Sequence, residues 1–218
     1  MKTDLDTYWK LRLERCVQAL KSNHFGAWLA ENCDDARGIV MEQILPHISV
    51  QSVSWGDSIT FHATGVLNAI RLNPHIRVLE TFAQDLSFDE KIERRRQALL
   101  ADLFFTGSNA VTEAGQLVNL DMIGNRVGGI AFGPKHVVIL AGRNKLVADV
   151  DAAMQRIRSY AAPVNAIRHA NFKTPCMKTG RCMDCSSPDR ICNTWTITEK
   201  SFPRERIHVV LINEDLGL

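Results

Sequence analysis

The sequence lacks several features that would assign a function directly. It contains no GxGxxG or Walker pattern, so no motif supports nucleotide binding. No run approaches the ~18 apolar residues of a membrane span. The opening residues MKTDLDTYWKLRLERC mix acids and bases and carry no signal-peptide core. We therefore expect a cytoplasmic protein, in which thiols stay reduced.

The sequence also has no large excess of charge of one sign and no histidine pattern of the HExxH type. The net charge is +2, too small to argue for nucleic acid or a membrane as a partner. None of the seven histidines belongs to an HExxH motif. The basic run at residues 94–96 falls within a helical pattern and is interpreted as a solvated helix face.

The chain has 218 residues, enough for one α/β domain with a substantial core and short for two. We expect a single domain over residues 1–218. Hydrophobic periodicity predicts helices at 1–22, 34–45, 61–70, 91–100, 150–160 and 164–169. Strands are predicted at 48–53, 76–81, 103–105, 110–112, 116–120, 136–141 and 206–212, with a hairpin turned at 113–115. This alternation predicts an α/β sheet with a β-hairpin excursion from it.

Four cysteines lie close together near the end of the chain, in the stretch TPCMKTGRCMDCSSPDRICN. They are Cys176, Cys182, Cys185 and Cys192, in the order C-x5-C-x2-C-x6-C. Four thiolates are the ligand set of a tetrahedral zinc ion or an iron–sulfur cluster. Prolines and glycines in the segment favour turns, which can bring nearby thiols to one point. The segment 173–195 is thus predicted to be a metal-binding loop.

The nature of that centre is left open. An iron–sulfur cluster, as a 4Fe-4S centre, is the favoured interpretation, and structural zinc is the alternative. A redox dithiol at the C-x-x-C pair is a third interpretation, since two residues separate Cys182 from Cys185. His169, seven residues before Cys176, is the one histidine retained as an additional candidate ligand.

Polar groups and glycines follow the predicted strand 103–105. Because ligands of open α/β sheets bind at the carboxyl ends of strands, we expect a cleft here. The candidates for ligand binding are Gly107, Ser108, Asn109 and Asn125. Glu113, Asp121 and Arg126 are the candidates for catalysis: Glu113 as base or nucleophile, and Arg126 as a two-pronged anion binder. The alternative is that Glu113 and Asp121 only satisfy backbone donors in turns.

The run TGSNAVTEAGQLVNLDMIGNRVGGIAFGPKHVVILAGRNKLV, followed by AAPVNAIRH, resembles the LUD (lactate utilisation) family. The cysteine segment resembles a branch that carries such a C-terminal motif. The resemblance implies the doubly wound fold of CoA transferases, ribose-5-phosphate isomerase and glucosamine-6-phosphate deaminase, with a smaller β element. It also adds Lys145 to the ligand cleft. The chain departs from the larger iron–sulfur members of lactate systems in lacking their ferredoxin-like region.

These observations lead to one favoured function and two alternatives. The favoured one is an iron–sulfur redox subunit in oxidation of lactate or a related hydroxy acid, with Arg126 and Lys145 orienting the carboxylate. Its partners would be a small carboxylate and iron–sulfur or flavin proteins. The alternatives are a non-redox CoA-transferase- or sugar-phosphate-isomerase-like enzyme with structural zinc, and a non-catalytic assembly subunit. The sequence leaves open whether the chain is catalytic alone or forms a homo-oligomer.

Overall fold

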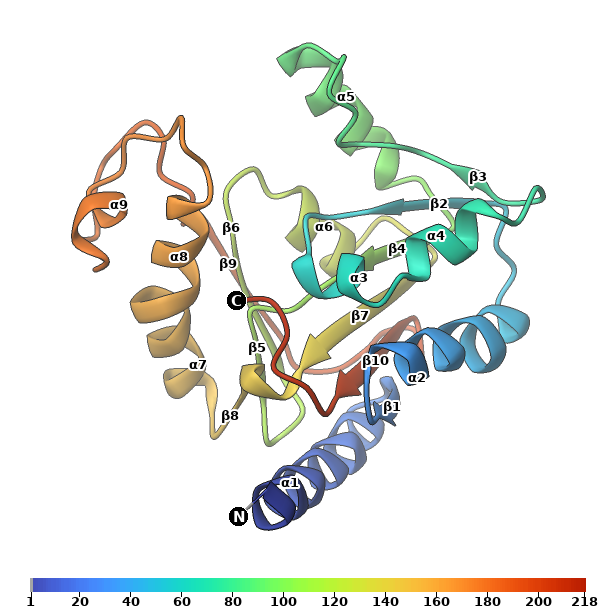
Figure 1. Ribbon diagram of the computed structural model, residues 1–218. Coiled ribbons are helices and arrows are strands. Elements are labelled where there is room, and N and C mark those ends of the chain that lie inside the picture. The colour runs from blue at the N-terminus through green and yellow to red at the C-terminus, as the bar shows by residue number, and fades with distance from the viewer. Residues whose placement is uncertain (1) are drawn as a thin grey trace.

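A six-stranded parallel sheet forms the centre of the molecule, which a computed structural model describes over residues 2–218 (Figure 1). The strands run in the order β1-β10-β7-β4-β2-β3, and every neighbouring pair is parallel. Their bounds are β1 Gly26–Ala30, β2 Ser52–Trp55, β3 Arg77–Val78, β4 Leu103–Thr106, β7 His136–Gly142 and β10 Ile207–Ile212. The four central strands are buried almost throughout, as expected for a parallel sheet covered on both faces.

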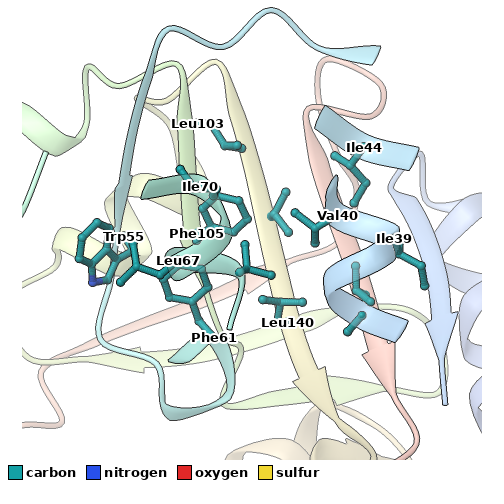
Figure 2. Packing of buried hydrophobic residues seen from close by; sticks show 14 of the residues in the cluster. Ile39, Val40, Ile44, Trp55, Phe61, Leu67, Ile70, Leu103, Phe105 and Leu140 are labelled. Carbon is teal, nitrogen blue, oxygen red and sulfur yellow. The ribbon is translucent and has the colours of Figure 1, made fainter. Parts of the chain in front are cut away.

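Helices pack on both faces of this sheet, which makes the fold doubly wound. On one face lie α2 Cys33–Gly38, α3 Ile59–Ala63 and α4 Val66–Arg71; a π-helical turn and a 3-10 turn extend α2 through residues 39–47. Figure 2 shows this face, where Phe61 of α3 stacks on Phe105 of β4 with ring centroids 4.9 Å apart. The opposite face is covered by α1 (Lys2–Ser22), whose Leu13, Cys16 and Leu20 are fully buried.

A second, four-stranded sheet is built around a hairpin. Its order is β8-β5-β6-β9, with bounds β5 Ala110–Thr112, β6 Leu117–Asp121, β8 Leu146–Val147 and β9 Thr194–Thr198. β5 and β6 are antiparallel, as the predicted hairpin requires. The helix α7 (Val150–Arg156) packs on this sheet through Ala153, and Ile157 of the following turn joins the same cluster.

Three further helices and a long loop surround these sheets (Figure 1). They are α5 Phe88–Ala98, α6 Asn125–Ala131 and α8 Ala162–Ile167, the last continuous with α7 through a π-helical turn at Ile157–Ala161. The predicted cysteine segment 173–195 follows α8, contains the short α9 (Cys176–Thr179) and leads into β9. Over residues 2–218, no helix is both long and apolar enough to cross a membrane.

The doubly wound sheet and its hairpin excursion are confirmed, and several local details differ from the prediction. The helix α6 and the strands β1 and β9 were not predicted. The strand predicted at 76–81 is reduced to the two residues of β3. The helices predicted at 150–160 and 164–169 are one continuous helical run, because the chain widens into a π-helical turn just before Pro163.

Candidate functional site

A cleft of about 580 Å³ lies where the predicted polar groups gather. It opens beyond the carboxyl ends of β4 and β7, the position at which doubly wound sheets bind ligands. Seven of the eight residues predicted for the cleft line it: Gly107, Ser108, Asn109, Asp121, Asn125, Arg126 and Lys145. The structure therefore brings these residues together from β4, α6 and the turn after β7.

Arg126 is the most heavily bonded residue of the cleft. Its Nη1 donates to Asn119 Oδ1 (2.9 Å) and to the Gly107 carbonyl (3.3 Å). Its Nη2 donates to Asn109 Oδ1 (2.8 Å) and to the Leu120 carbonyl (2.9 Å). The side chain is only 9% exposed. Both terminal nitrogens already donate hydrogen bonds within the chain, so Arg126 has no free pair of N–H groups to bind a ligand carboxylate. It is a structural residue that ties the loop after β4 to β6.

Asp121 also serves the chain itself. One carboxylate oxygen accepts from the backbone N–H of Arg126 (3.1 Å) and of Val127 (3.4 Å). The other lies 3.6 Å from Arg126 Nε. Asp121 therefore satisfies two donors in the first turn of α6, and this accords with the structural alternative drawn from the sequence.

Lys145 differs from Arg126 because almost nothing in the chain balances it. It is 5% exposed, and the one hydrogen bond from its Nζ goes to Thr60 Oγ1 (3.0 Å). Within the described chain no carboxylate lies within 4 Å of Nζ. Burial, together with the positive charges of Arg156 and Arg126, lowers the pKa of Lys145 to about 7. A ligand anion in the cleft would supply the countercharge that Lys145 lacks.

The floor around Lys145 is closely packed. A Cβ atom at Gly107 would lie 2.8 Å from Ser58 Oγ and 3.6 Å from Lys145 Nζ, so only glycine fits there without displacement. Ser108 is turned away from the ligand space, since its hydroxyl donates to the Ala110 carbonyl (2.8 Å). Glycine at 107 thus leaves the amine of Lys145 accessible from the cleft.

Three cations that were not predicted from the sequence also line the cleft. Lys91 and Arg95 extend from α5, and Arg168 follows α8. Arg168 lies 3.9 Å from Asp57, whereas Arg95 Nε is buried and has no hydrogen-bond partner. The sequence did contain a signal for the α5 pair, because Lys91 and Arg95 are four residues apart and therefore lie on one face of the helix. Arg95 was instead interpreted, within the run 94–96, as part of a solvated helix face.

Glu113 does not line this cleft, contrary to the prediction. It lies in the hairpin turn between β5 and β6, about half exposed, and its Oε1 accepts from Arg12 Nη2 (2.6 Å) and Nε (2.9 Å). The reason is the direction of β5, which carries the chain away from the cleft before it turns. Glu113 links the hairpin to α1, and its position gives no support to a role as base or nucleophile in the cleft.

The four loop cysteines line one small cavity of about 20 Å³. Arg190 holds the loop around it by donating to the carbonyls of Cys185 (2.6 Å) and Cys192 (3.0 Å) and to Asp184 Oδ1 (2.8 Å). Burial raises the pKa of the Cys192 thiol; Arg190 opposes this effect, and the neighbouring Cys182 adds to it. All six cysteines of the chain are free thiols.

These cysteines fit a metal centre in kind, number and shared cavity. Four thiols are the donor set of zinc and of 4Fe-4S clusters. Across residues 2–218, however, no group of three or more Cys, His, Asp or Glu side chains is arranged so that it could hold a metal ion. A metal centre in the loop is therefore a proposal that rests on the donor set, to be carried by Cys176, Cys182, Cys185 and Cys192.

The cysteine cavity and the cleft share a wall. Ala162 at the start of α8 and Ile191 in the loop line both spaces. His169, the additional candidate ligand, lines the cleft and not the cysteine cavity, and its ring packs on Phe172 with centroids 4.8 Å apart. A centre held by the thiols would thus border the space in which a ligand binds.

The fold and site define a doubly wound α/β domain with a cationic cleft and a neighbouring cysteine loop. The model of the LUD domain matches residues 13–212, and the chain belongs to this family. Comparison with curated proteins gave no match. A crystal structure of a DUF162 family protein from Deinococcus radiodurans is similar in fold, with a TM-score of 0.53 and 12% identity over 94% of this chain and 98% of that chain.

Proposed function

We propose that this LUD domain protein is a redox subunit that binds a small hydroxy acid, such as lactate, in the cleft and carries an iron–sulfur centre on its cysteine loop. The proposal places the chain in the branch of the family with a C-terminal four-cysteine motif. The observation that carries it is the wall of Ala162 and Ile191 shared by the cleft and the cysteine cavity. A reducing, cytoplasmic location suits six free thiols.

In this proposal Lys145 anchors the carboxylate of the acid. Its amine is buried and lines the cleft, and among the residues that the structure describes the Thr60 hydroxyl is the one hydrogen-bond partner of this amine. Arg126, which the sequence assigned to this role, instead fixes the shape of the cleft through its four bonds to the chain. The side chains of Ile157 and Phe172 line the cleft and would exclude water from a bound acid.

The cysteine loop contributes the redox centre. Cys176, Cys182, Cys185 and Cys192 would hold a 4Fe-4S cluster, which supplies one-electron transfer when bound. Arg190 positions two of these residues through their carbonyls and puts a positive charge beside the thiols. Oxidation of a hydroxy acid to a keto acid releases two electrons, so the proposal includes an iron–sulfur or flavin partner protein as acceptor.

The test is the metal content of protein purified without oxygen. We expect iron with matching acid-labile sulfide and a broad visible band, and we expect both to be lost in Cys182→Ser because one of four thiolate ligands is removed. Cys33→Ser is the matched control, since Cys33 lies in α2, outside the cavity, and should keep the full iron content. Colourless protein that holds zinc in the wild type and in Cys33→Ser, and loses it in Cys182→Ser, would overturn the redox proposal and favour a structural zinc.

A further inference from the structure

The cleft is much larger than a three-carbon acid requires. At about 580 Å³ it falls in the range of roughly 300–1,000 Å³ that holds drug-sized ligands. Lactate bound at Lys145 would leave most of this volume to water. The proposed function does not explain the additional volume of the cleft or the charged side chains that line it.

Two separate groups of cations line this space without an acidic partner. The first is Lys145, on the turn after β7. The second is formed by Lys91 and Arg95, which lie one helical turn apart on α5. Within the described chain, neither member of the α5 pair has a carboxylate within 4 Å. The two groups come from different elements of the fold, the turn after β7 and the helix α5.

The position of Arg95 is costly in the absence of an anion. Burial lowers the pKa of Arg95, and its Nε is buried with no hydrogen-bond partner. An Nε–H group left in this way loses the hydration that it has in water. Its contact over the Phe82 ring, 5.5 Å from the centroid, fixes it against the cleft wall but satisfies no N–H group.

The acidic side chains in the cleft only partly offset these charges: Asp121 and Asp57 raise the pKa of Arg95, but burial, which lowers it, is the larger effect. Asp121 accepts from the backbone of α6, and Asp57 lies 3.9 Å from Arg168. Both of these acidic side chains are engaged within the chain, and the side chains that line the cleft therefore keep an excess of positive charge.

We propose that the natural ligand of this cleft is a hydroxy acid with a second anionic group, bound at Lys145 by one anionic end and at Arg95 and Lys91 by the other. A dicarboxylic hydroxy acid or a phosphorylated one has this chemistry. The inference rests on the proposed function only in taking the ligand to be a hydroxy acid. It differs in excluding lactate as the best ligand.

The experiment compares lactate with longer acids that carry an added anionic group. Calorimetric binding is measured for L-lactate, L-malate, L-2-hydroxyglutarate and 3-phosphoglycerate at one ionic strength, to wild type, Lys145→Gln and Arg95→Gln. We expect at least one dianion to bind about tenfold or more tightly than lactate. Arg95→Gln should weaken that dianion about tenfold and leave lactate unchanged, whereas Lys145→Gln should weaken both.

Two further variants make the comparison decisive. Arg96→Gln removes the same charge from an exposed neighbour on α5 that does not line the cleft, and it should bind like the wild type. Lys91→Gln repeats the test at the second cation of the pair and should also weaken only the dianion. Circular dichroism of each variant ensures that only folded proteins are compared.

Each contrary result has a separate meaning. If lactate binds as tightly as every dianion, or if Arg95→Gln weakens both equally, the inference is overturned and the proposed hydroxy-acid site stands. If no acid binds, both are overturned. If a dianion binds through Arg95 while oxygen-free protein holds no iron, the dianion site stands and the redox function falls.

Discussion

Lys145 and Arg126 are both buried cations of one cleft, and their surroundings assign them different roles. Arg126 makes four hydrogen bonds to the chain, while Lys145 makes one, to a neutral hydroxyl. A buried cation with its donors satisfied contributes to the structure, whereas one without a countercharge favours an anionic ligand. At the scale of residues, therefore, the bonding partners and not the residue type separate a binding group from a structural one.

The low pKa of Lys145 predicts pH-dependent binding of a carboxylate. Its pKa is lowered to about 7, so the amine carries its charge below pH 7 and loses it above. Since the carboxylate binds the ammonium form, the association constant should be constant below pH 7. It should then fall by up to about tenfold per pH unit as the pH rises further. Calorimetric titrations between pH 5.5 and 9 provide the measurement, with malate as the ligand.

The matched control for this pH profile is Lys145→Gln. It should bind weakly and with an affinity that does not change over the same range, because an amide does not titrate. A wild-type profile that remains flat to pH 9 would show that another group holds the carboxylate.

At the scale of elements, the loop after β4, strand β6 and helix α6 form one unit. The side chains of Asn109 and Asn119 bridge the loop after β4 and the strand β6. Asn109 N–H donates to Asn119 Oδ1 (3.1 Å), and Leu120 N–H donates to Asn109 Oδ1 (3.0 Å). Both side-chain oxygens also accept from Arg126. This unit connects the second sheet to the first and fixes one wall of the cleft.

Replacing the guanidinium of Arg126 should weaken this unit. Arg126→Lys keeps the charge but has one nitrogen in place of three, so at least two buried acceptors lose their donor. We expect a loss of about 3 kcal/mol in the free energy of unfolding, measured in urea. Arg96→Lys, at an exposed position of α5, should change it by less than about 0.5 kcal/mol. A similar small change in both variants would contradict the structural role assigned to Arg126.

The sequence predicts some of these elements and not others, for physical reasons. The buried strand β4 was readable because its apolar run is bounded by polar residues. The strand β1, GAWLA, was missed because it has no β-branched residue, although the alternating TWTIT of β9 did carry the signal. The helix α6 was not predicted because its sequence contains glycines, which are unfavourable in helices. Gly129 is needed there because a Cβ would lie 2.9 Å from the Phe104 ring.

The site was predictable in its location but not in its roles. Reasoning from strand ends in α/β sheets and from the polar groups around them located the cleft and six of its residues, and the family resemblance added Lys145. Which side chains are already bonded depends on contacts between distant segments, such as Glu113 with Arg12, 101 residues apart. No local pattern reports such contacts, and for this reason the sequence did not indicate that Glu113 and Arg126 are already bonded within the chain.

At the scale of the whole molecule, the cysteine loop lies outside the packed core. The two clusters that cover the central sheet are built from other segments, and none of the four loop cysteines is a buried member of either. Cys192 only packs against the third, smaller cluster, beside the second sheet. The central sheet should therefore keep its stability whatever the loop binds.

This arrangement predicts a local response when the four loop cysteines are all replaced by serine. Amide hydrogen exchange should accelerate within residues 173–195, because any metal held there is lost, and should be unchanged in β7 and β10, which belong to the core. Mass spectrometry of the exchanging protein resolves the two regions. If protection of β7 and β10 fell together with that of the loop, the centre would be a structural staple of the fold, as the zinc alternative requires. Unchanged protection of β7 and β10 would show that the loop does not stabilise the core. A centre in the loop would then be available for redox chemistry beside the cleft.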